Sequence, residues 1–221
     1  MIDIHTHIIP NVDDGSSSIE QSLEMIRQEI SVGVKEIVCT PHHILNRYEK
    51  SVEEIKEKFE QLQQAVEENK LPVKLYLGQE IYYTPREDIL AKLENKQLLT
   101  LNNTNRVLLE FSFTREPEDI QEIIYHFNIK GYKVIVAHVE RYEWITLEKV
   151  YALKSEGALI QVNSGALVGL TTGKEKRFVK KLLKNDLVDI IASDMHSFRP
   201  STLDKALKIT KRKDLFSFKL D

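Results

Sequence analysis

The histidines carry most of the chemistry available to this sequence, because six of the seven lie just past the C-terminal ends of predicted β-strands. They are His5, His7, His42, His43, His138 and His196. The carboxylates in comparable positions are Asp13, Asp14, Glu80, Glu110 and Asp194. Imidazole nitrogen and carboxylate oxygen without thiolate suit Mn, Fe or Zn, and they argue against a structural zinc site.

Two short motifs near the ends of the chain have the spacing of metal ligands. In His5-Thr6-His7 both rings point to the same side of an extended chain, and Asp194-Met195-His196 repeats that geometry. Either motif alone is weak evidence, but together with ligands at the intervening strand ends they indicate a metal centre. The groups are too many for one ion, so we predict two or three ions bridged by a carboxylate such as Glu80. Such clusters activate water and clamp the oxygens of a displacement at phosphorus.

The elements that must position these side chains alternate between aliphatic strands and amphipathic helices. Near-continuous aliphatic runs predict strands at residues 2–4, 34–39, 73–78, 106–111, 133–137, 158–162 and 188–192. Parallel β/α units follow from this order, as a closed barrel or an open doubly wound sheet. Either arrangement brings the carboxyl ends of the strands to one rim, where such folds place their active sites.

Helix start and stop signals lie between the strands. Ser17-Ser18-Ile19-Glu20 and Ser51-Val52-Glu53-Glu54 are predicted capping boxes, and Thr84-Pro85 predicts a third helix start. Apolar spacing predicts further helices around residues 120–127, 147–153 and 178–183. No glycine-rich nucleotide-binding motif follows a strand, which disfavours nucleotide-binding versions of the fold.

Composition narrows the protein class. The chain has 221 residues, 42% hydrophobic and 29% charged, which is typical of one globular domain over residues 1–221. A net charge of −3 disfavours nucleic-acid binding. One cysteine excludes an internal disulfide. Without a signal-peptide pattern or a long apolar run, we expect a cytoplasmic protein that does not insert into membranes.

Other nucleophiles and ligands have simpler interpretations. Cys39 does not begin the C-x5-R motif of cysteine phosphatases, because Leu45 stands where arginine is required, so we predict a buried strand residue. No G-x-S-x-G motif is present for serine hydrolysis. His126 has the position of a surface residue on a helix, and His43 is either a spare ligand or part of the pocket wall.

Six short motifs together resemble the PHP (polymerase and histidinol phosphatase) superfamily. They are His5-Thr6-His7, Thr40-Pro41-His42, Gly78-Gln79-Glu80, Leu109-Glu110-Phe111, Ala137-His138-Val139-Glu140-Arg141 and Ser193-Asp194-Met195-His196. The opening, including Pro10-Asn11-Val12-Asp13-Asp14-Gly15, is similar to the metal-dependent protein-tyrosine phosphatases of the CpsB/YwqE type from Gram-positive bacteria. The resemblance extends from Met1 to about Pro200.

This resemblance implies a distorted (β/α)7 TIM-like barrel with two or three divalent ions, usually Mn2+, with Fe, Zn, Co or Mg as alternatives. The implied ligands of the first ion are His5, His7, Glu80 and Asp194. Glu80 would bridge to a second ion on Glu110 and His138, and Asp14, His42 and His196 would hold the third. Arg141 and Arg199 are implied as catalytic groups that bind the phosphate, and His43 is a further candidate for substrate binding.

The expected activity is hydrolysis of phosphotyrosine on the C-terminal tail of a bacterial tyrosine kinase that controls capsule or exopolysaccharide synthesis. A metal-activated water would attack phosphorus without a covalent intermediate. Three alternatives stay open: a histidinol-phosphate phosphatase, a metal-dependent exonuclease, and a non-catalytic metal-bound partner of the kinase. Relatives of this type continue past Asp221 into a further helix, so we expect a weaker closing layer or weaker oligomer contacts; the oligomeric state is left open.

Overall fold

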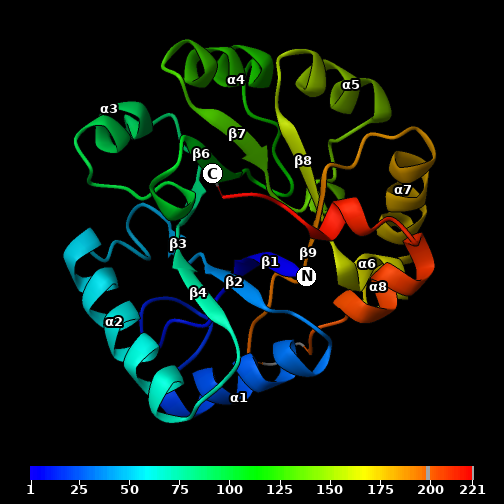
Figure 1. Ribbon diagram of the computed structural model, residues 1–221. Helices are drawn as coiled ribbons and strands as arrows, with labels where there is room; N and C mark the ends of the chain where they lie inside the picture. The colour runs from blue at the N-terminus through cyan, green and yellow to red at the C-terminus, as the bar shows by residue number, and fades with distance from the viewer. Residues whose placement is uncertain (198–199, 221) are drawn as a thin grey trace.

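A ring of parallel strands surrounded by helices forms the protein in the computed structural model, which describes residues 1–197 and 200–220 (Figure 1). The strand segments are β1 (Ile2–Thr6), β2 (Glu36–Cys39), β3 (His42–His43), β4 (Lys74–Leu77), β5 (Glu80–Tyr82), β6 (Arg106–Glu110), β7 (Lys133–Val136), β8 (Leu159–Asn163) and β9 (Ile190–Ala192). They form one sheet in the order β1-β2-β4 and another in the order β3-β5-β6-β7-β8-β9. Every strand pair in both sheets is parallel.

The nine segments occupy seven strand positions of a barrel. β3 continues β2 after Pro41, and β5 continues β4 after Gly78, where an added Cβ would lie 2.7 Å from the Leu101 side chain. The ring closes because Asp194 donates its backbone N–H to the His5 carbonyl at 3.0 Å and His7 donates to the Met195 carbonyl at 2.9 Å. All seven predicted strands are present, and the distorted (β/α)7 barrel is confirmed over the open sheet.

Helices cover the outside of the ring (Figure 1). They are α1 (Ile19–Ser31), α2 (Val52–Glu68), α3 (Ile89–Glu94), α4 (Ile120–Ile129), α5 (Leu147–Ser155), α6 (Ser164–Val168), α7 (Gly173–Lys184) and α8 (Leu203–Thr210). Short 3-10 helices are η1 (Leu101–Asn103), η2 (Val139–Arg141) and η3 (Lys213–Phe216). The capping box of Ser51 and Glu54 is confirmed at α2. The prediction that a helix starts at Thr84-Pro85 is wrong, since α3 begins at Ile89 behind the N-cap Asp88.

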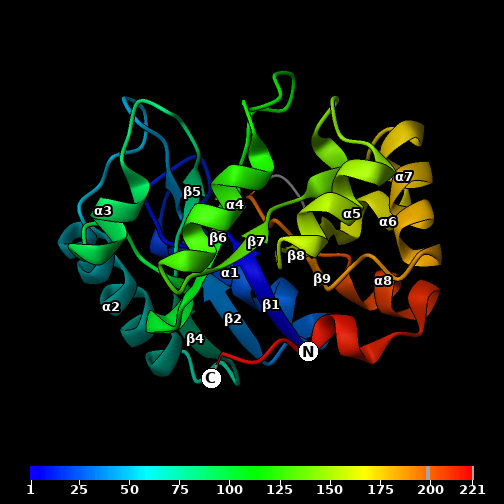
Figure 2. The ribbon, with the colours of Figure 1, turned by 90° about the horizontal axis from the view of Figure 1, so that it is seen from above.

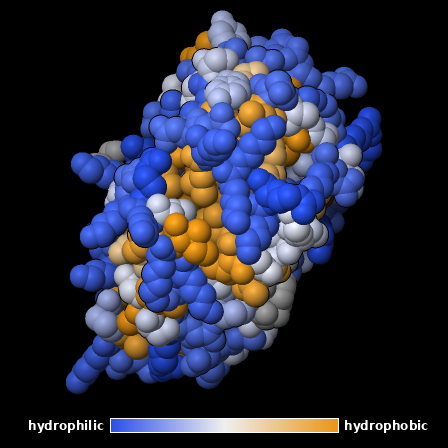
Figure 3. Space-filling model, turned by 90° about the vertical axis from the view of Figure 1, so that its right-hand side faces the viewer, coloured by the Kyte–Doolittle hydropathy of each residue, from blue (hydrophilic) through white to orange (hydrophobic). Residues whose placement is uncertain are grey.

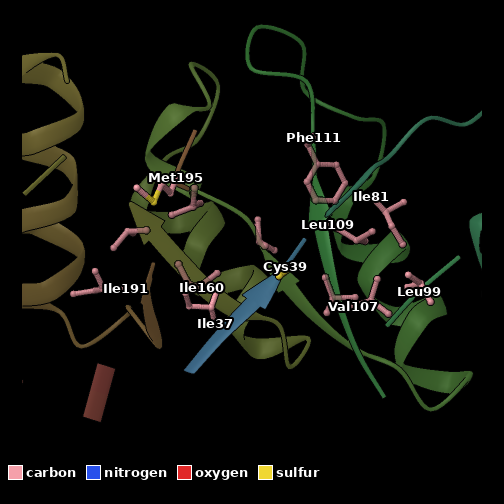
Figure 4. Packing of buried hydrophobic residues seen from close by; sticks show 14 of the residues in the cluster. Ile37, Cys39, Ile81, Leu99, Val107, Leu109, Phe111, Ile160, Ile191 and Met195 are labelled. Atoms are coloured by element: carbon pink, nitrogen blue, oxygen red, sulfur yellow. The ribbon is translucent and has the colours of Figure 1, made fainter. Parts of the chain in front are cut away.

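Successive side chains of a strand point to opposite faces of the sheet, and the two faces belong to two separate hydrophobic cores. Inward-facing side chains fill the barrel, with Ile4, Val38, Leu108, Ile135 and Ala192 among them. Their outward-facing neighbours pack against the helices, as Figure 4 shows for Ile37, Cys39, Leu109 and Ile160. Cys39 is fully buried as predicted, and burial raises the pKa of its thiol, so no reactive thiolate is available there.

The two ends of the barrel differ. Figure 2 shows both chain termini at one end and the connections that follow the strands at the other. At the terminal end, Phe218 and Leu220 pack against the inner core, and the guanidinium of Arg106 lies over the Phe218 ring at 5.1 Å. The opposite end, where the strands finish, is therefore free to carry a site.

One face of the protein is mainly hydrophilic. Figure 3 shows the side that carries α7 and α8, where an apolar strip lies between hydrophilic side chains. Leu170 and Ile209, which belong to this region, are among the exposed large apolar residues. Among the described residues, no helix is both long enough and apolar enough to cross a bilayer.

Candidate metal centre

The structure brings all nine predicted ligands together at the carboxyl end of the barrel. Their donor atoms form four overlapping groups, each with its atoms within 4.8 Å of one another. The nine residues are His5, His7, Asp14, His42, Glu80, Glu110, His138, Asp194 and His196. Seven of the nine are buried, His42 is partly buried and Asp14 is exposed.

The Glu80 carboxylate lies at the middle of this cluster. Its Oε2 atom is 3.1 Å from His5 Nε2, 3.3 Å from His7 Nε2 and 3.0 Å from His42 Nδ1. Its Oε1 atom is 2.9 Å from His138 Nε2. Within the described part of the chain, Oε2 has no hydrogen-bond donor with acceptable geometry although it is buried. Four imidazoles therefore face one carboxylate that can bridge neighbouring ions.

The spacing of His5, His7 and Asp194 fits a shared cation. The two Nε2 atoms are 3.3 Å apart, and Asp194 Oδ1 lies 3.6 Å from His5 Nε2 and 3.5 Å from His7 Nε2. Two ligands that bind one ion at about 2.1 Å stand about 3.0–3.4 Å apart, depending on the coordination geometry. Small movements would bring these three residues and Glu80 into that range.

Two further groups flank the first. His138 Nε2 lies 3.6 Å from Glu110 Oε1, close to its contact with Glu80. On the other side, Asp14 Oδ1 lies 3.6 Å from His42 Nε2 and 3.4 Å from His196 Nε2. The groups overlap, because Glu80 and His138 are grouped with His5, and Glu80 and Glu110 with His42.

Irregular backbone conformations set the direction of several of these side chains. The pairing of β1 with β2 shifts by one residue between Asp3 and Thr6, which is a bulge. Because of this extra residue, His5 faces the barrel interior directly after the inward-facing Ile4. His138 has φ 28° and Asp194 has φ 52°, a left-handed conformation that is uncommon for residues other than glycine. Such conformations concentrate at functional sites, where surrounding contacts maintain them.

Asp13 organises the first loop without joining the cluster of nine. Its Oδ2 atom lies 2.7 Å from His7 Nδ1 and accepts the His42 backbone N–H at 2.9 Å, while Oδ1 accepts the Gly15 N–H at 2.9 Å. A carboxylate on the second ring nitrogen fixes the tautomer and orientation of a metal-binding histidine. This contact leaves His7 Nε2 directed at Glu80 and Asp194.

Two amides at the end of β8 support the cluster, and the sequence analysis missed them. Gln161 Oε1 accepts the His138 backbone N–H at 2.6 Å and lies 3.3 Å from His5 Nδ1. Gln161 donates to Asn163 Oδ1 at 2.8 Å, and Asn163 donates to Asp194 Oδ2 at 2.8 Å. The sequence offers one signal for them: they are two residues apart at the end of a strand, so both side chains face the same way at the rim that carries the ligands.

The electrostatics of the cluster indicate a shortage of positive charge. Burial and then the nearby Glu80 raise the pKa of Glu110 to about 9. Burial lowers the pKa of His138 to about 4. Burial also opposes the charge on Glu80, but the surrounding imidazoles, His5 first, hold its pKa well below the usual range. Divalent cations would supply the missing charge and let Glu110 ionise, so the donor set fits a metal centre.

A cavity of about 410 Å³ opens over the cluster. Its walls are Asp14, His42, Ile44, Arg47, Tyr82, Glu110, Phe113, Arg141 and His196. The Arg141 guanidinium donates to Asp194 Oδ2 at 3.1 Å and lies 4.1 Å from the centre of the Phe113 ring. Arg47 was not predicted; its guanidinium lies over Tyr48, whose ring stacks on His42.

One predicted substrate-binding residue, His43, is not among the walls of this cavity. His43 follows His42 in the strand and so faces the other way, where its Nε2 lies 2.9 Å from Glu87 Oε1. Arg199 lies outside the described residues. His126, predicted to be a surface residue, is half-exposed on α4 beside Glu122.

Comparisons with known proteins place the chain among phosphatases. Residues 1–215 match the family "Capsular polysaccharide synthesis, CpsB/CapC". The tyrosine-protein phosphatase CpsB of Streptococcus agalactiae is 37% identical over 221 residues, covering 96% of this chain and 90% of that protein.

Solved structures agree with this assignment. The chain superimposes with a TM-score of 0.89 and 32% identity on a structure reported for YwqE from Bacillus subtilis and CpsB from Streptococcus pneumoniae, described as unique metal-dependent tyrosine phosphatases; the match covers 98% of this chain and 88% of the other. Histidinol phosphate phosphatase from Lactococcus lactis shares the fold at a TM-score of 0.62 and 15% identity, covering 98% and 95%. The chain belongs to the CpsB/CapC family of metal-dependent tyrosine phosphatases.

Proposed function

We propose that this chain, as a single phosphatase domain over residues 1–221, hydrolyses phosphotyrosine in proteins at a centre of two or three divalent ions. The observation that carries the proposal is the convergence of four imidazoles on the Glu80 carboxylate beneath an open cavity. Relatives named as tyrosine-protein phosphatases support it.

The ligands divide into three sets in this proposal. His5, His7, Glu80 and Asp194 hold the first ion. Glu80, Glu110 and His138 hold the second, and Asp14, His42 and His196 hold the third. The interatomic distances of 2.9–3.6 Å within these sets support the division. Mn2+ is the proposed metal, and this identity comes only from the resemblance.

The chain's own residues would bind and orient the phosphate ester. Divalent ions at the centre supply an activated water and offset the charge of the phosphate oxygens. Arg141, held by Asp194 and Phe113 at the cavity wall, binds the equatorial phosphate oxygens through its planar guanidinium. Ile44, Tyr82 and Phe113 offer apolar surface to the tyrosyl ring. Arg199 is proposed as a second phosphate-binding group from the sequence motif alone.

The finer biological setting is also a proposal. We propose that the substrate is the C-terminal tail of a bacterial tyrosine kinase and that the reaction takes place in the cytoplasm. The capsule-synthesis name of the family supports this choice. His43 is not proposed to bind substrate, because its side chain pairs with Glu87 on the far side of the strand.

The decisive experiment compares three substrates on the purified protein loaded with Mn2+, Zn2+, Fe2+, Co2+ or Mg2+ in turn. A phosphotyrosyl peptide and p-nitrophenyl phosphate should be hydrolysed, histidinol phosphate should be a poor substrate, and EDTA should abolish activity. Preferential turnover of histidinol phosphate would support the small-molecule alternative. Full metal loading without hydrolysis of any substrate would support a non-catalytic role.

A further inference from the structure

A second cavity of about 460 Å³ lies beside the one over the metal centre. It lies between the connection after β5 and the connection after β6, with Tyr83, Arg86, Ser112, Arg115 and Glu118 among its walls. We call it the flanking groove. Its volume is in the range of ligand-binding pockets, about 300–1,000 Å³.

The flanking groove adjoins the cavity over the metal centre. Tyr82 lines both spaces. Phe111 and Ser112 line the groove, and Phe113, one residue further, lines the cavity over the ligands. Tyr82 is also paired with Glu110 in the register of β5 and β6. A polypeptide that places a phosphotyrosine over the ligands can therefore pass along Tyr82 into the groove.

Hydrogen bonds hold the inner wall of the groove in place. Phe111 donates its backbone N–H to the Tyr142 hydroxyl at 3.1 Å, and the Trp144 indole donates to the Ser112 carbonyl at 2.8 Å. Tyr83 donates its backbone N–H to the Glu110 carbonyl at 2.8 Å. A wall that is already ordered loses little conformational entropy when a ligand binds.

The positive charges on the walls of the flanking groove favour an acidic ligand. Arg86 and Arg115 are exposed, one on each connection, and in the described part of the chain neither guanidinium forms an ion pair. Of the two acidic wall residues, Glu116 is neutralised by an ion pair with Lys149, which leaves Glu118. Arginine is suited to carboxylates and phosphates because its planar fork donates two parallel hydrogen bonds.

We propose that the flanking groove binds the residues next to the phosphotyrosine of a protein substrate, and that Arg86 and Arg115 select an acidic side chain there. This proposal rests on the proposed phosphotyrosine phosphatase activity and specifies its substrate class as acidic phosphopeptides. A small aryl phosphate reaches the ligands without entering the groove, so the two arginines affect peptides only.

The kinetic test uses the double variant Arg86→Ala/Arg115→Ala with three substrates. These are a phosphotyrosyl peptide flanked by Asp and Glu, the same peptide with Asn and Gln, and p-nitrophenyl phosphate. We expect KM for the acidic peptide to rise about 10-fold at unchanged kcat, as the loss of charge-assisted hydrogen bonds predicts. KM for the other two substrates should change less than about 2-fold. Arg27→Ala, an exposed arginine on α1 paired with Glu24, is the matched control.

A binding test is independent of turnover. The acidic and neutral peptides are made with a non-hydrolysable phosphonate in place of phosphotyrosine, labelled with fluorescein and titrated by anisotropy. The wild type should bind the acidic peptide more tightly, the double variant should lose that preference, and Arg86→Lys/Arg115→Lys should recover part of it. Equal affinity of the wild type for both peptides, or a preference that survives the double variant, overturns the proposal. Failure of the wild type to hydrolyse p-nitrophenyl phosphate with any metal would instead contradict the proposed function.

Discussion

The Nε2 atoms of His5 and His7 lie 3.3 Å apart, with the Nδ1 atom of each ring facing a different polar side chain. Two imidazole nitrogens at this distance need a positive charge between them, because their lone pairs otherwise repel. In the chain alone a proton meets this need: burial opposes it, but Asp13, Asp194 and Glu80 together outweigh burial and raise the pKa of His7 well above its usual range. A divalent cation would meet the same need with four ligands instead of two.

Glu80→Gln should remove metal and activity together. The substitution keeps the shape of the side chain but removes the charge that faces four imidazoles. We expect the variant to retain at least one ion fewer per chain and to lose more than about 100-fold in kcat, in line with the size of catalytic electrostatic effects. Metal analysis after gel filtration and turnover of p-nitrophenyl phosphate measure both. Glu57→Gln, exposed on α2, serves as control, and normal metal content in Glu80→Gln would refute the bridging role.

Asp13→Ala should weaken metal binding although Asp13 is not among the nine ligands. Without the carboxylate, His7 loses the partner on Nδ1 and the loop loses the acceptor of the His42 and Gly15 N–H groups. Loss of such a partner typically costs 10–100-fold in metal affinity, so about that reduction is expected. Calorimetric titration with Mn2+ measures it. Asp13→Asn keeps one acceptor oxygen and should lie between the wild type and the alanine variant; an unchanged Kd for Asp13→Ala would contradict the role.

Arg141→Ala should reduce turnover while leaving the metal in place. Its guanidinium is at the cavity wall and is not one of the metal-binding groups. We expect kcat on aryl phosphates to fall by at least about 10-fold, as the removal of a charge-stabilising donor commonly does. Arg141→Lys keeps the charge without the planar fork and should recover only part of the rate. Near-normal turnover of fully metal-loaded Arg141→Ala would exclude it as a phosphate-binding group.

The fold was predictable because buried parallel strands have an unmistakable aliphatic pattern, and the rim that carries the site follows from strand direction. The strand prediction for residues 106–111, for example, differs from β6 by a single residue. Helix ends were less certain where competing signals lie close together: Pro85 resembled a helix start, but Asp88 caps α3. The short α6 contains a single turn or so of helix, too little for a periodic pattern.

The candidate site was predictable as a set of residue types but not in its finer geometry. The bulge in β1 and the left-handed backbone of His138 and Asp194 leave no mark in composition. His43 was grouped with His42 because neighbouring histidines look equivalent in a sequence, whereas a strand directs them to opposite faces. Gln161 and Asn163 were missed because neutral amides give no charge signal.

Gly15→Ala should disrupt the loop that carries Asp13 and Asp14. An added Cβ would lie 2.0 Å from the His7 carbonyl oxygen and 2.5 Å from the His7 Cβ, so the backbone must move. The expected cost is about 1–3 kcal/mol in the free energy of unfolding, with weaker Mn2+ binding. Urea denaturation and calorimetry measure the two effects. Gly173→Ala is the control, because its Cβ would approach only the flexible end of Arg177 at 3.3 Å; equal stability of the two variants would show that the loop adapts.

Glu29→Gln should stabilise the protein more at high pH than at low pH. Glu29 on α1 is buried, with both carboxylate oxygens lacking hydrogen-bond partners among the described residues. Burial and then the nearby Asp3 raise its pKa well above the ordinary value, so the folded state keeps a proton that the unfolded chain releases above about pH 4.5. Because the folded state binds more protons, its free energy of unfolding falls with rising pH by up to about 1.4 kcal/mol per unit until Glu29 ionises.

Glutamine removes this linkage without changing the side-chain shape, so the advantage of Glu29→Gln over the wild type should grow from pH 5 to pH 8. Urea denaturation at each pH measures the difference. Glu53→Gln, a substitution at an exposed residue of α2, is the matched control. A constant difference for Glu29→Gln would mean that Glu29 is ionised in the folded protein and would contradict the prediction.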